Sequence, residues 1–193
     1  MNPSREEAYN LMTEWTESDS LRKHMLSVET AVRAYAQKFG EDEERWAVAA
    51  LLHDFDYEKH PHMGGEDGHP FVGVNYLREQ GYPEDILEAI LGHADFSGVP
   101  RVTPMAKTLY ACDEITGLIT AAVLVRPDKN IANQELKSLK KKFKDKAFAR
   151  GVNREDVQRG ADELGIELWE HVAFVLAAMQ ANAEALGLDG SLT

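Results

Sequence analysis

The sequence predicts an all-α fold. Apolar residues recur at helical spacing along most of the 193 residues, and no stretch alternates in the way that a half-buried strand does. The composition, 44% hydrophobic and 28% charged, is typical of a soluble globular protein. Because no Pro-, Gly- or Ser-rich linker interrupts the chain, we expect one domain that spans residues 1–193.

The first three helices are indicated by residues at their ends. Ser4 and Glu7 have the spacing of a capping box and open a short helix at 4–15. A second helix is expected at 19–40 and a third at 42–55. The second carries an apolar stripe that includes one histidine: Leu21, His24, Met25, Val28, Ala31, Val32 and Tyr35.

The middle of the chain begins with a polar, Gly-rich loop at 56–68. His69 and Pro70 are expected to open a helix, with Pro70 at its first position, and this helix is expected to end near residue 81. Another helix is expected at 84–94, and a long apolar helix at 103–125 is stopped by a proline.

The chain beyond residue 126 differs in charge. Ten basic and three acidic residues lie between Arg126 and Arg154, and helices are expected at 153–164 and 167–186. A charge run such as the Lys-rich stretch at 137–146 is usually a solvated face. Local positive charge also attracts anionic ligands, so both interpretations of this stretch stay open.

Charge and residue usage exclude several classes of protein. A net charge of −12 argues against general nucleic-acid binding, which needs surplus Lys and Arg. No apolar run approaches the ~20 residues of a membrane span, and the N-terminus lacks the apolar region of a signal peptide. The single Cys112 excludes internal disulfides and a thiolate metal cage. We therefore expect a cytoplasmic protein.

Histidines and aspartates recur within or beside the predicted helices: His24, His53, Asp54, His69, His93 and Asp113. Neutral imidazoles and carboxylates suit divalent Fe, Mn, Co, Ni or Zn. A single histidine on an apolar face is more often structural, as we expect for His171. Asp113 is more telling, because a carboxylate amid apolar helix residues is costly unless it is paired or binds a metal.

The order H…HD…H…H…D, over roughly residues 21–125, resembles the HD-domain superfamily of metal-dependent phosphohydrolases. The resemblance implies a helical bundle with its metal-binding core at about 20–126 and a helical extension at 127–193. It also implies two divalent metals, the first held by His24, His53, Asp54 and Asp113, and the second held by Asp54, His69 and His93. His62 is the alternative to His69 as the third histidine ligand.

The same resemblance implies hydrolysis of a small phosphorylated metabolite or nucleotide by metal-activated water, with Asp54 positioning both metals. The twenty residues from His93 to Asp113 resemble the compact ending of bacterial enzymes that split dinucleoside tetraphosphates. A di-iron oxygenase of the same fold and a non-catalytic nucleotide sensor are the alternatives. A homodimer is left open.

Several cations are expected to assist this chemistry. One two-metal subgroup has a lysine three residues after the motif aspartate, where this chain has Tyr57, and Lys59 follows two residues later. Lys59 and Lys107 are the candidates for a catalytic role. Substrate phosphate is expected to contact a second set of cations: Arg101, Lys107, Lys140 and Lys141.

Overall fold

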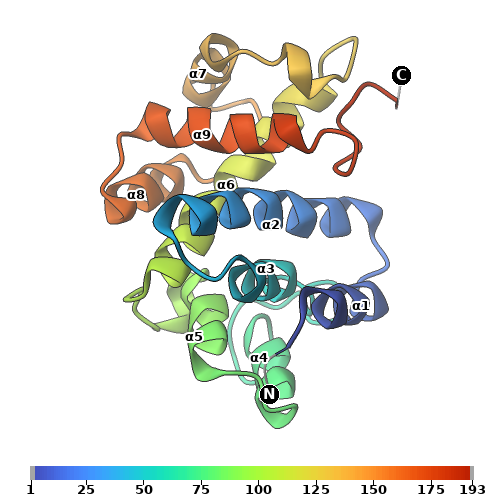
Figure 1. Ribbon diagram of the computed structural model, residues 1–193, viewed down its shortest axis with the longest axis vertical. Coiled ribbons are helices and arrows are strands. Elements are labelled where there is room, and N and C mark those ends of the chain that lie inside the picture. The colour runs from blue at the N-terminus through green and yellow to red at the C-terminus, as the bar shows by residue number, and fades with distance from the viewer. Residues whose placement is uncertain (1–2, 192–193) are drawn as a thin grey trace. The chain divides into compact units, whose positions relative to one another are not determined.

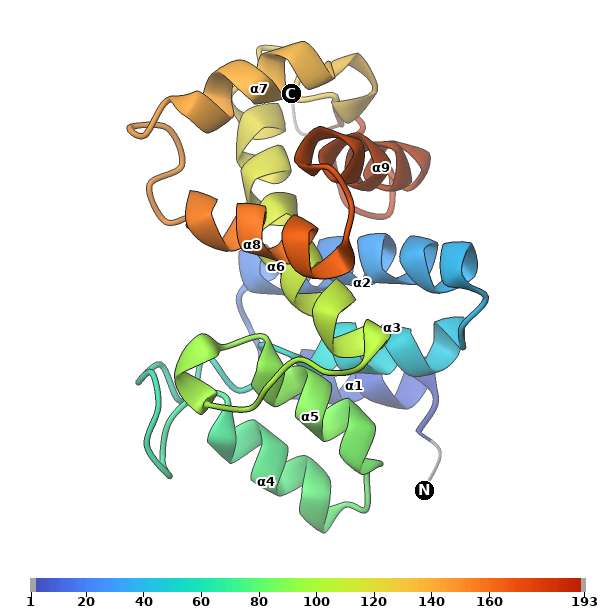
Figure 2. The same cartoon turned by 90° about the vertical axis from the view of Figure 1, so that its left-hand side faces the viewer.

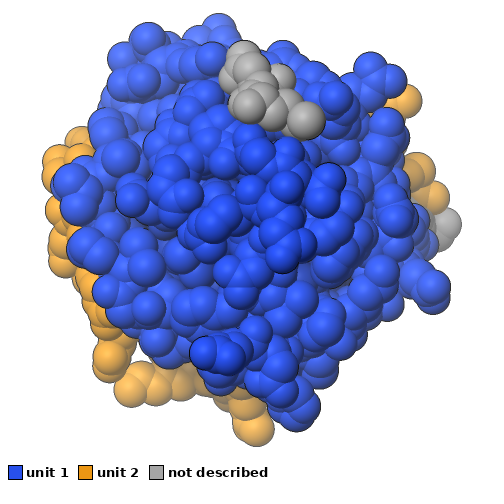
Figure 3. All heavy atoms as spheres, turned by 90° about the horizontal axis from the view of Figure 1, so that it is seen from below, with its two compact units in different colours: residues 1–110 blue, residues 111–193 orange. Residues whose placement is uncertain are grey.

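The computed structural model describes residues 3–191 of the chain (Figure 1). Over this range it contains nine α-helices, two short 3-10 helices and no β-strand, which confirms the all-α prediction. The chain forms two compact units, residues 1–110 and 111–193, which Figure 3 distinguishes by colour. The organisation of residues 1–193 as a single domain stays a prediction.

The N-terminal unit begins with α1 (Arg5–Trp15), α2 (Asp19–Phe39) and α3 (Glu43–Leu52). The capping box at Ser4 is formed as the sequence predicted, since its side chain accepts from the backbone of Glu7 and the Glu7 side chain accepts in return. Helix α3 packs against both α1 and α2, and its residues from 46 to 52 are all buried. A helix buried on every side lies at the centre of this unit.

The predicted helix at 42–55 ends earlier than expected, at Leu52. His53 is the residue that closes α3, and the chain then turns tightly, with the Tyr57 N–H donating to the Asp54 carbonyl at 3.0 Å. These turns replace the helical hydrogen-bond pattern. His53 and Asp54 therefore lie at the point where the buried helix gives way to a loop.

The next two helices, α4 (Phe71–Glu79) and α5 (Glu84–Gly92), lie side by side (Figures 1 and 2). Pro70 precedes α4 and does not occupy its first position, which corrects the expectation, and the His69–Pro70 peptide bond is cis. His93 directly follows α5, and the short 3-10 helix η1 (Asp95–Ser97) comes next. Both histidines are thus placed where a helix begins or ends.

Helix α6 (Pro104–Leu124) begins in the N-terminal unit and continues into the C-terminal one. The remaining elements are η2 (Ile131–Asn133), α7 (Leu136–Lys144), α8 (Arg154–Leu164) and α9 (Leu168–Ala181). Helix α9 is shorter than the predicted 167–186. Within residues 3–191, no helix combines the length and apolar character needed to cross a membrane.

In the C-terminal unit, α8 and α9 both contact Ala111 of α6. A Cβ at Gly160 of α8 would lie 2.6 Å from the Cα of Ala111, so only glycine permits this approach of α8 to α6. His171 of α9 is fully buried, and its Nε2 lies 2.8 Å from the Ala111 carbonyl oxygen. This contact fits the structural role expected for His171.

Burial also raises the pKa of the Cys112 thiol, which keeps that thiol protonated.

Candidate metal centre

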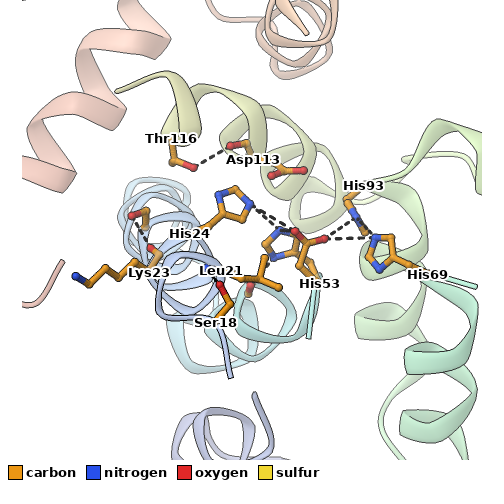
Figure 4. A network of polar contacts seen from close by, with 12 residues as sticks. Ser18, Leu21, Lys23, His24, His53, His69, His93, Asp113 and Thr116 are labelled. Atoms are coloured by element: carbon orange, nitrogen blue, oxygen red, sulfur yellow. Dashed lines mark hydrogen bonds and ion pairs between the residues drawn. The ribbon is translucent and has the colours of Figure 1, made fainter. Parts of the chain in front are cut away.

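Four histidines of the N-terminal unit converge on one carboxylate, that of Asp54 (Figure 4). They come from separate elements: α2, the end of α3, the loop before α4 and the end of α5. Three of these histidines are buried, whereas His24 is partly exposed. The packing of α2, α3 and α5 therefore assembles residues that are far apart in the sequence.

The two oxygens of Asp54 face different pairs of histidines. Oδ2 lies 3.7 Å from Nε2 of His24 and 3.5 Å from Nε2 of His53. Oδ1 lies 3.4 Å from Nε2 of both His69 and His93. Within each pair the two Nε2 atoms are also close, at 3.3 Å for His24 and His53 and 3.2 Å for His69 and His93. The carboxylate thus stands between two pairs of imidazoles.

The other ring nitrogen of three histidines is held by an oxygen. Nδ1 of His53 donates to the Ala50 carbonyl at 2.7 Å, and Nδ1 of His93 donates to the carbonyl of Ile90. A carbonyl oxygen can only accept, so Nδ1 carries the proton in each ring. In a neutral imidazole this leaves the lone pair on Nε2, directed at Asp54.

His69 is oriented by a buried carboxylate that the sequence analysis did not single out. Asp56 is 1% exposed; its Oδ1 accepts from Nδ1 of His69 at 2.7 Å, and its Oδ2 accepts from the Gly73 N–H at 2.7 Å. A Cβ at Gly73 would lie 2.8 Å from the carboxyl carbon of Asp56, so glycine leaves the room that this side chain fills. Carboxylate–histidine pairs of this kind orient metal ligands in many proteins. The nearest signal in the sequence is the short separation of Asp56 from the His-Asp pair.

These donors fit a divalent metal. Asp54, His69 and His93 each offer one ligand atom, and these atoms lie within 4.8 Å of one another. Lone pairs on facing imidazoles repel one another and repel a carboxylate, and a cation among them converts this repulsion into attraction. Nitrogen and oxygen donors without thiolate suit first-row transition metals.

The other proposed ligands are placed as follows. Asp113 lies in the middle of α6, partly buried, and its backbone carbonyl accepts from the Thr116 hydroxyl at 2.8 Å. His62 is exposed in the loop, and its carbonyl accepts from the His69 N–H at 2.9 Å. Nε2 of His69 faces Asp54, whereas His62 is exposed, and the choice of His69 as the third histidine ligand stays a prediction. The ring of Tyr57 lies edge-on to that of His69, with the centroids 5.3 Å apart.

The predicted cations differ in their surroundings. Arg101 donates to the Gly92 carbonyl at 2.8 Å and to Asp95 at 2.7 Å, so it ties down the end of α5 beside His93. The amine of Lys59 lies over the ring of Trp15, 4.8 Å from its centroid. In the C-terminal unit, Lys140 lies over the ring of Trp169 at 5.1 Å, and Lys141 is exposed.

Lys107 is partly buried in the first turns of α6. Its neighbour Ala106 packs near the end of α5, because a Cβ at Gly92 would lie 3.9 Å from the Cβ of Ala106. The start of α6 is therefore close to the segment that presents His93.

Comparison with known proteins gives one family and one relative. The family model of the HD domain matches residues 21–118, just over half of the chain. Ribonuclease Y from Oleidesulfovibrio alaskensis (strain ATCC BAA-1058 / DSM 17464 / G20) is 29% identical over 100 residues, which are 52% of this chain and 18% of that protein. The match thus spans less than a fifth of the relative's length. No significant match to a solved structure was found.

The matched segment contains Asp54 and all four histidines around it. An HD domain indicates a metal-dependent phosphohydrolase family and binds divalent metals. The helical fold agrees with this assignment. The chain therefore belongs to the HD domain family.

Proposed function

We propose that this protein is a phosphohydrolase that uses divalent metal to act on a small phosphorylated metabolite or nucleotide, with dinucleoside polyphosphates among the candidate substrates. The observation that carries this proposal is the position of Asp54 between two pairs of imidazoles. A carboxylate in this position is suited to bridging two cations, and paired metals are common in enzymes that hydrolyse phosphate esters.

The proposed ligand sets follow the two oxygens of Asp54. Oδ2 and the pair His24 and His53 contribute to a first metal, which Asp113 completes. Oδ1 and the pair His69 and His93 hold a second metal. One ligand atom from each of Asp54, His69 and His93 lies within 4.8 Å of the other two, and this supports the second ligand set. The place of Asp113 rests on its position in the order of the sequence motif.

The chain's own residues have separable roles in this scheme. When bound, a divalent metal lowers the pKa of water and stabilises charge on phosphoryl oxygens. Asp54 would orient the centre, and its carboxylate would accept a proton from the attacking water. The Nδ1 contacts of His53 and His93 fix both rings before substrate arrives, so less reorganisation accompanies the reaction.

Substrate phosphate needs positive charge beside the metals. We propose Lys107 as the main contact, because it is partly exposed and follows Ala106, which packs near Gly92 and so near His93. Lys59 is the second candidate for a catalytic role, although its amine lies over Trp15. The further candidates for phosphate binding are Arg101, Lys140 and Lys141.

Replacing His69 or His93 singly by alanine is expected to remove the second metal and keep the first. Each change deletes one of the two imidazoles that face Oδ1, whereas the pair that faces Oδ2 is untouched. Elemental analysis of the purified variants measures the number of metals per chain. Loss of all metal in both variants would show that the centre is not divided as we propose. The exposed His62, changed to alanine, is the control and should keep the wild-type metal content.

Turnover is expected without dioxygen. Protein purified anaerobically and supplied with Mn, Co, Ni or Fe(II) should release phosphate or a nucleotide under argon. The screen includes nucleotides, sugar phosphates, dinucleoside polyphosphates and short oligoribonucleotides, the last because one relative is named as a ribonuclease. Stoichiometric consumption of dioxygen, with no activity under argon, would instead assign the protein to the di-iron oxygenases of this fold.

A further inference from the structure

The C-terminal unit contains a cavity of about 630 Å³ in the segment that links α7 to α8. Its lining joins four cationic residues to an aromatic and an aliphatic side chain: Phe143, Lys144, Lys146, Arg150, Gly151, Val152, Asn153 and Arg154. Among residues 3–191, no acidic residue lines this cavity. Small-molecule sites in proteins measure roughly 300–1,000 Å³, so this cavity has the size of a ligand site.

The wall of the cavity is held by Arg154. Its guanidinium donates to the carbonyls of Ala149 at 2.6 Å and of Val152 at 2.7 Å, and also to those of Phe143, Asp145 and Phe148. The side chain of Arg154 thus connects residues near both ends of the loop between α7 and α8. Carbonyl oxygens satisfy its donors without cancelling its charge, because they are neutral dipoles.

The other cations also keep their charge. Across residues 3–191, no carboxylate forms an ion pair with Lys144, Lys146 or Arg150. The nearby carboxylates of Asp145 and Glu114 accept from backbone N–H groups, at 2.9 and 3.1 Å. Four positive charges around one cavity repel one another, and a multiply charged anion relieves this repulsion.

We propose that this cavity binds a small anionic ligand with a chain of phosphates, such as a nucleoside triphosphate. The cations would hold the phosphates, and Phe143 and Val152 would offer apolar surface to the remainder of the molecule. The ring of Trp169 packs edge-on against that of Phe143, with the centroids 5.4 Å apart, and holds it in place. The volume, which is typical of small-molecule sites, favours a small ligand over an extended polymer.

Calorimetric titration of metal-stripped protein in EDTA tests the proposal, with inorganic tripolyphosphate and ATP as the probes. Both should bind saturably to the wild type. Lys146→Gln with Arg150→Gln should weaken binding about tenfold, since both charges face the bound anion. The matched control, Lys38→Gln with Lys137→Gln, removes the same charge from positions outside the cavity and should leave the affinity nearly unchanged. Arg154 is left intact because it holds the loop.

The variant Gly151→Phe tests whether the ligand enters the cavity or binds only to a charged surface. A Cβ at Gly151 meets no atom within 4 Å, so the loop accommodates a side chain there, and the aromatic ring would fill space while every cation remains. Binding should weaken about tenfold in this variant too. Tighter binding of ATP than of tripolyphosphate would assign the apolar surface to the nucleoside, and equal binding would assign recognition to the phosphates alone.

Two results would overturn the proposal: no saturable binding of either probe to the wild type, or equal weakening of binding in both charge variants. The proposal does not rest on the function proposed for the metal centre. The variant with His53→Ala and Asp54→Ala should bind tripolyphosphate as the wild type does, so failure at one site is distinguishable from failure at the other.

Discussion

Replacing His53 and Asp54 together by alanine is expected to leave the protein with no bound metal. Asp54 faces all four histidines of the centre, and His53 is fully buried beside it. The double change removes the shared anion and one imidazole, so neither proposed metal keeps its ligand set. Elemental analysis after dialysis against trace metal measures the outcome, and phosphate release should be lost with the metal.

A control must separate loss of ligands from loss of fold. Replacing His60 and His62 by alanine removes two histidines from the neighbouring loop, where His62 is exposed, and should preserve metal content. Circular dichroism should show that the His53 and Asp54 variant remains helical, because α3 itself ends at Leu52. Full metal content in a folded double variant would disprove the assignment of the centre.

Replacing Asp56 by asparagine is expected to weaken binding of the second metal about 10- to 100-fold, the usual effect of removing a group that orients a ligand. Asp56 accepts two hydrogen bonds, one on each carboxylate oxygen, from His69 and from Gly73. Asparagine offers one acceptor oxygen and can satisfy only one of these donors. His69 then loses its fixed orientation, or the Gly73 N–H is left without an acceptor at a cost of about 1–3 kcal/mol.

Metal titration distinguishes this positioning role from general destabilisation. At a temperature where the variant is folded, the first metal should bind with wild-type affinity and only the second should weaken. Gly73→Ala should act in the same direction, because its Cβ would press on the carboxylate of Asp56. Asp67→Asn removes an exposed acid from the same loop and should have no effect. Equal weakening of both metals by Asp56→Asn would refute a role specific to His69.

The sequence by itself determined the helical fold and several helix ends, because these depend on neighbours along the chain. The capping box at Ser4 is formed, and the glycine at position 40 ends α2 with a φ of 72°, as its sequence position indicated. The order of histidines and aspartates also predicted the centre's composition. The structure brings Asp54 together with four histidines, and their role as metal ligands stays a prediction.

Only the tertiary structure decided which oxygen faces which histidine and which loop acid is buried. Asp56 and Asp67 belong to one polar stretch of sequence, yet Asp56 is buried and Asp67 is exposed. The difference arises from contacts with His69 and Gly73, which are 13 and 17 residues beyond Asp56. Burial of a carboxylate is favourable only where donors meet it, and the place of those donors is set by the packing of helices.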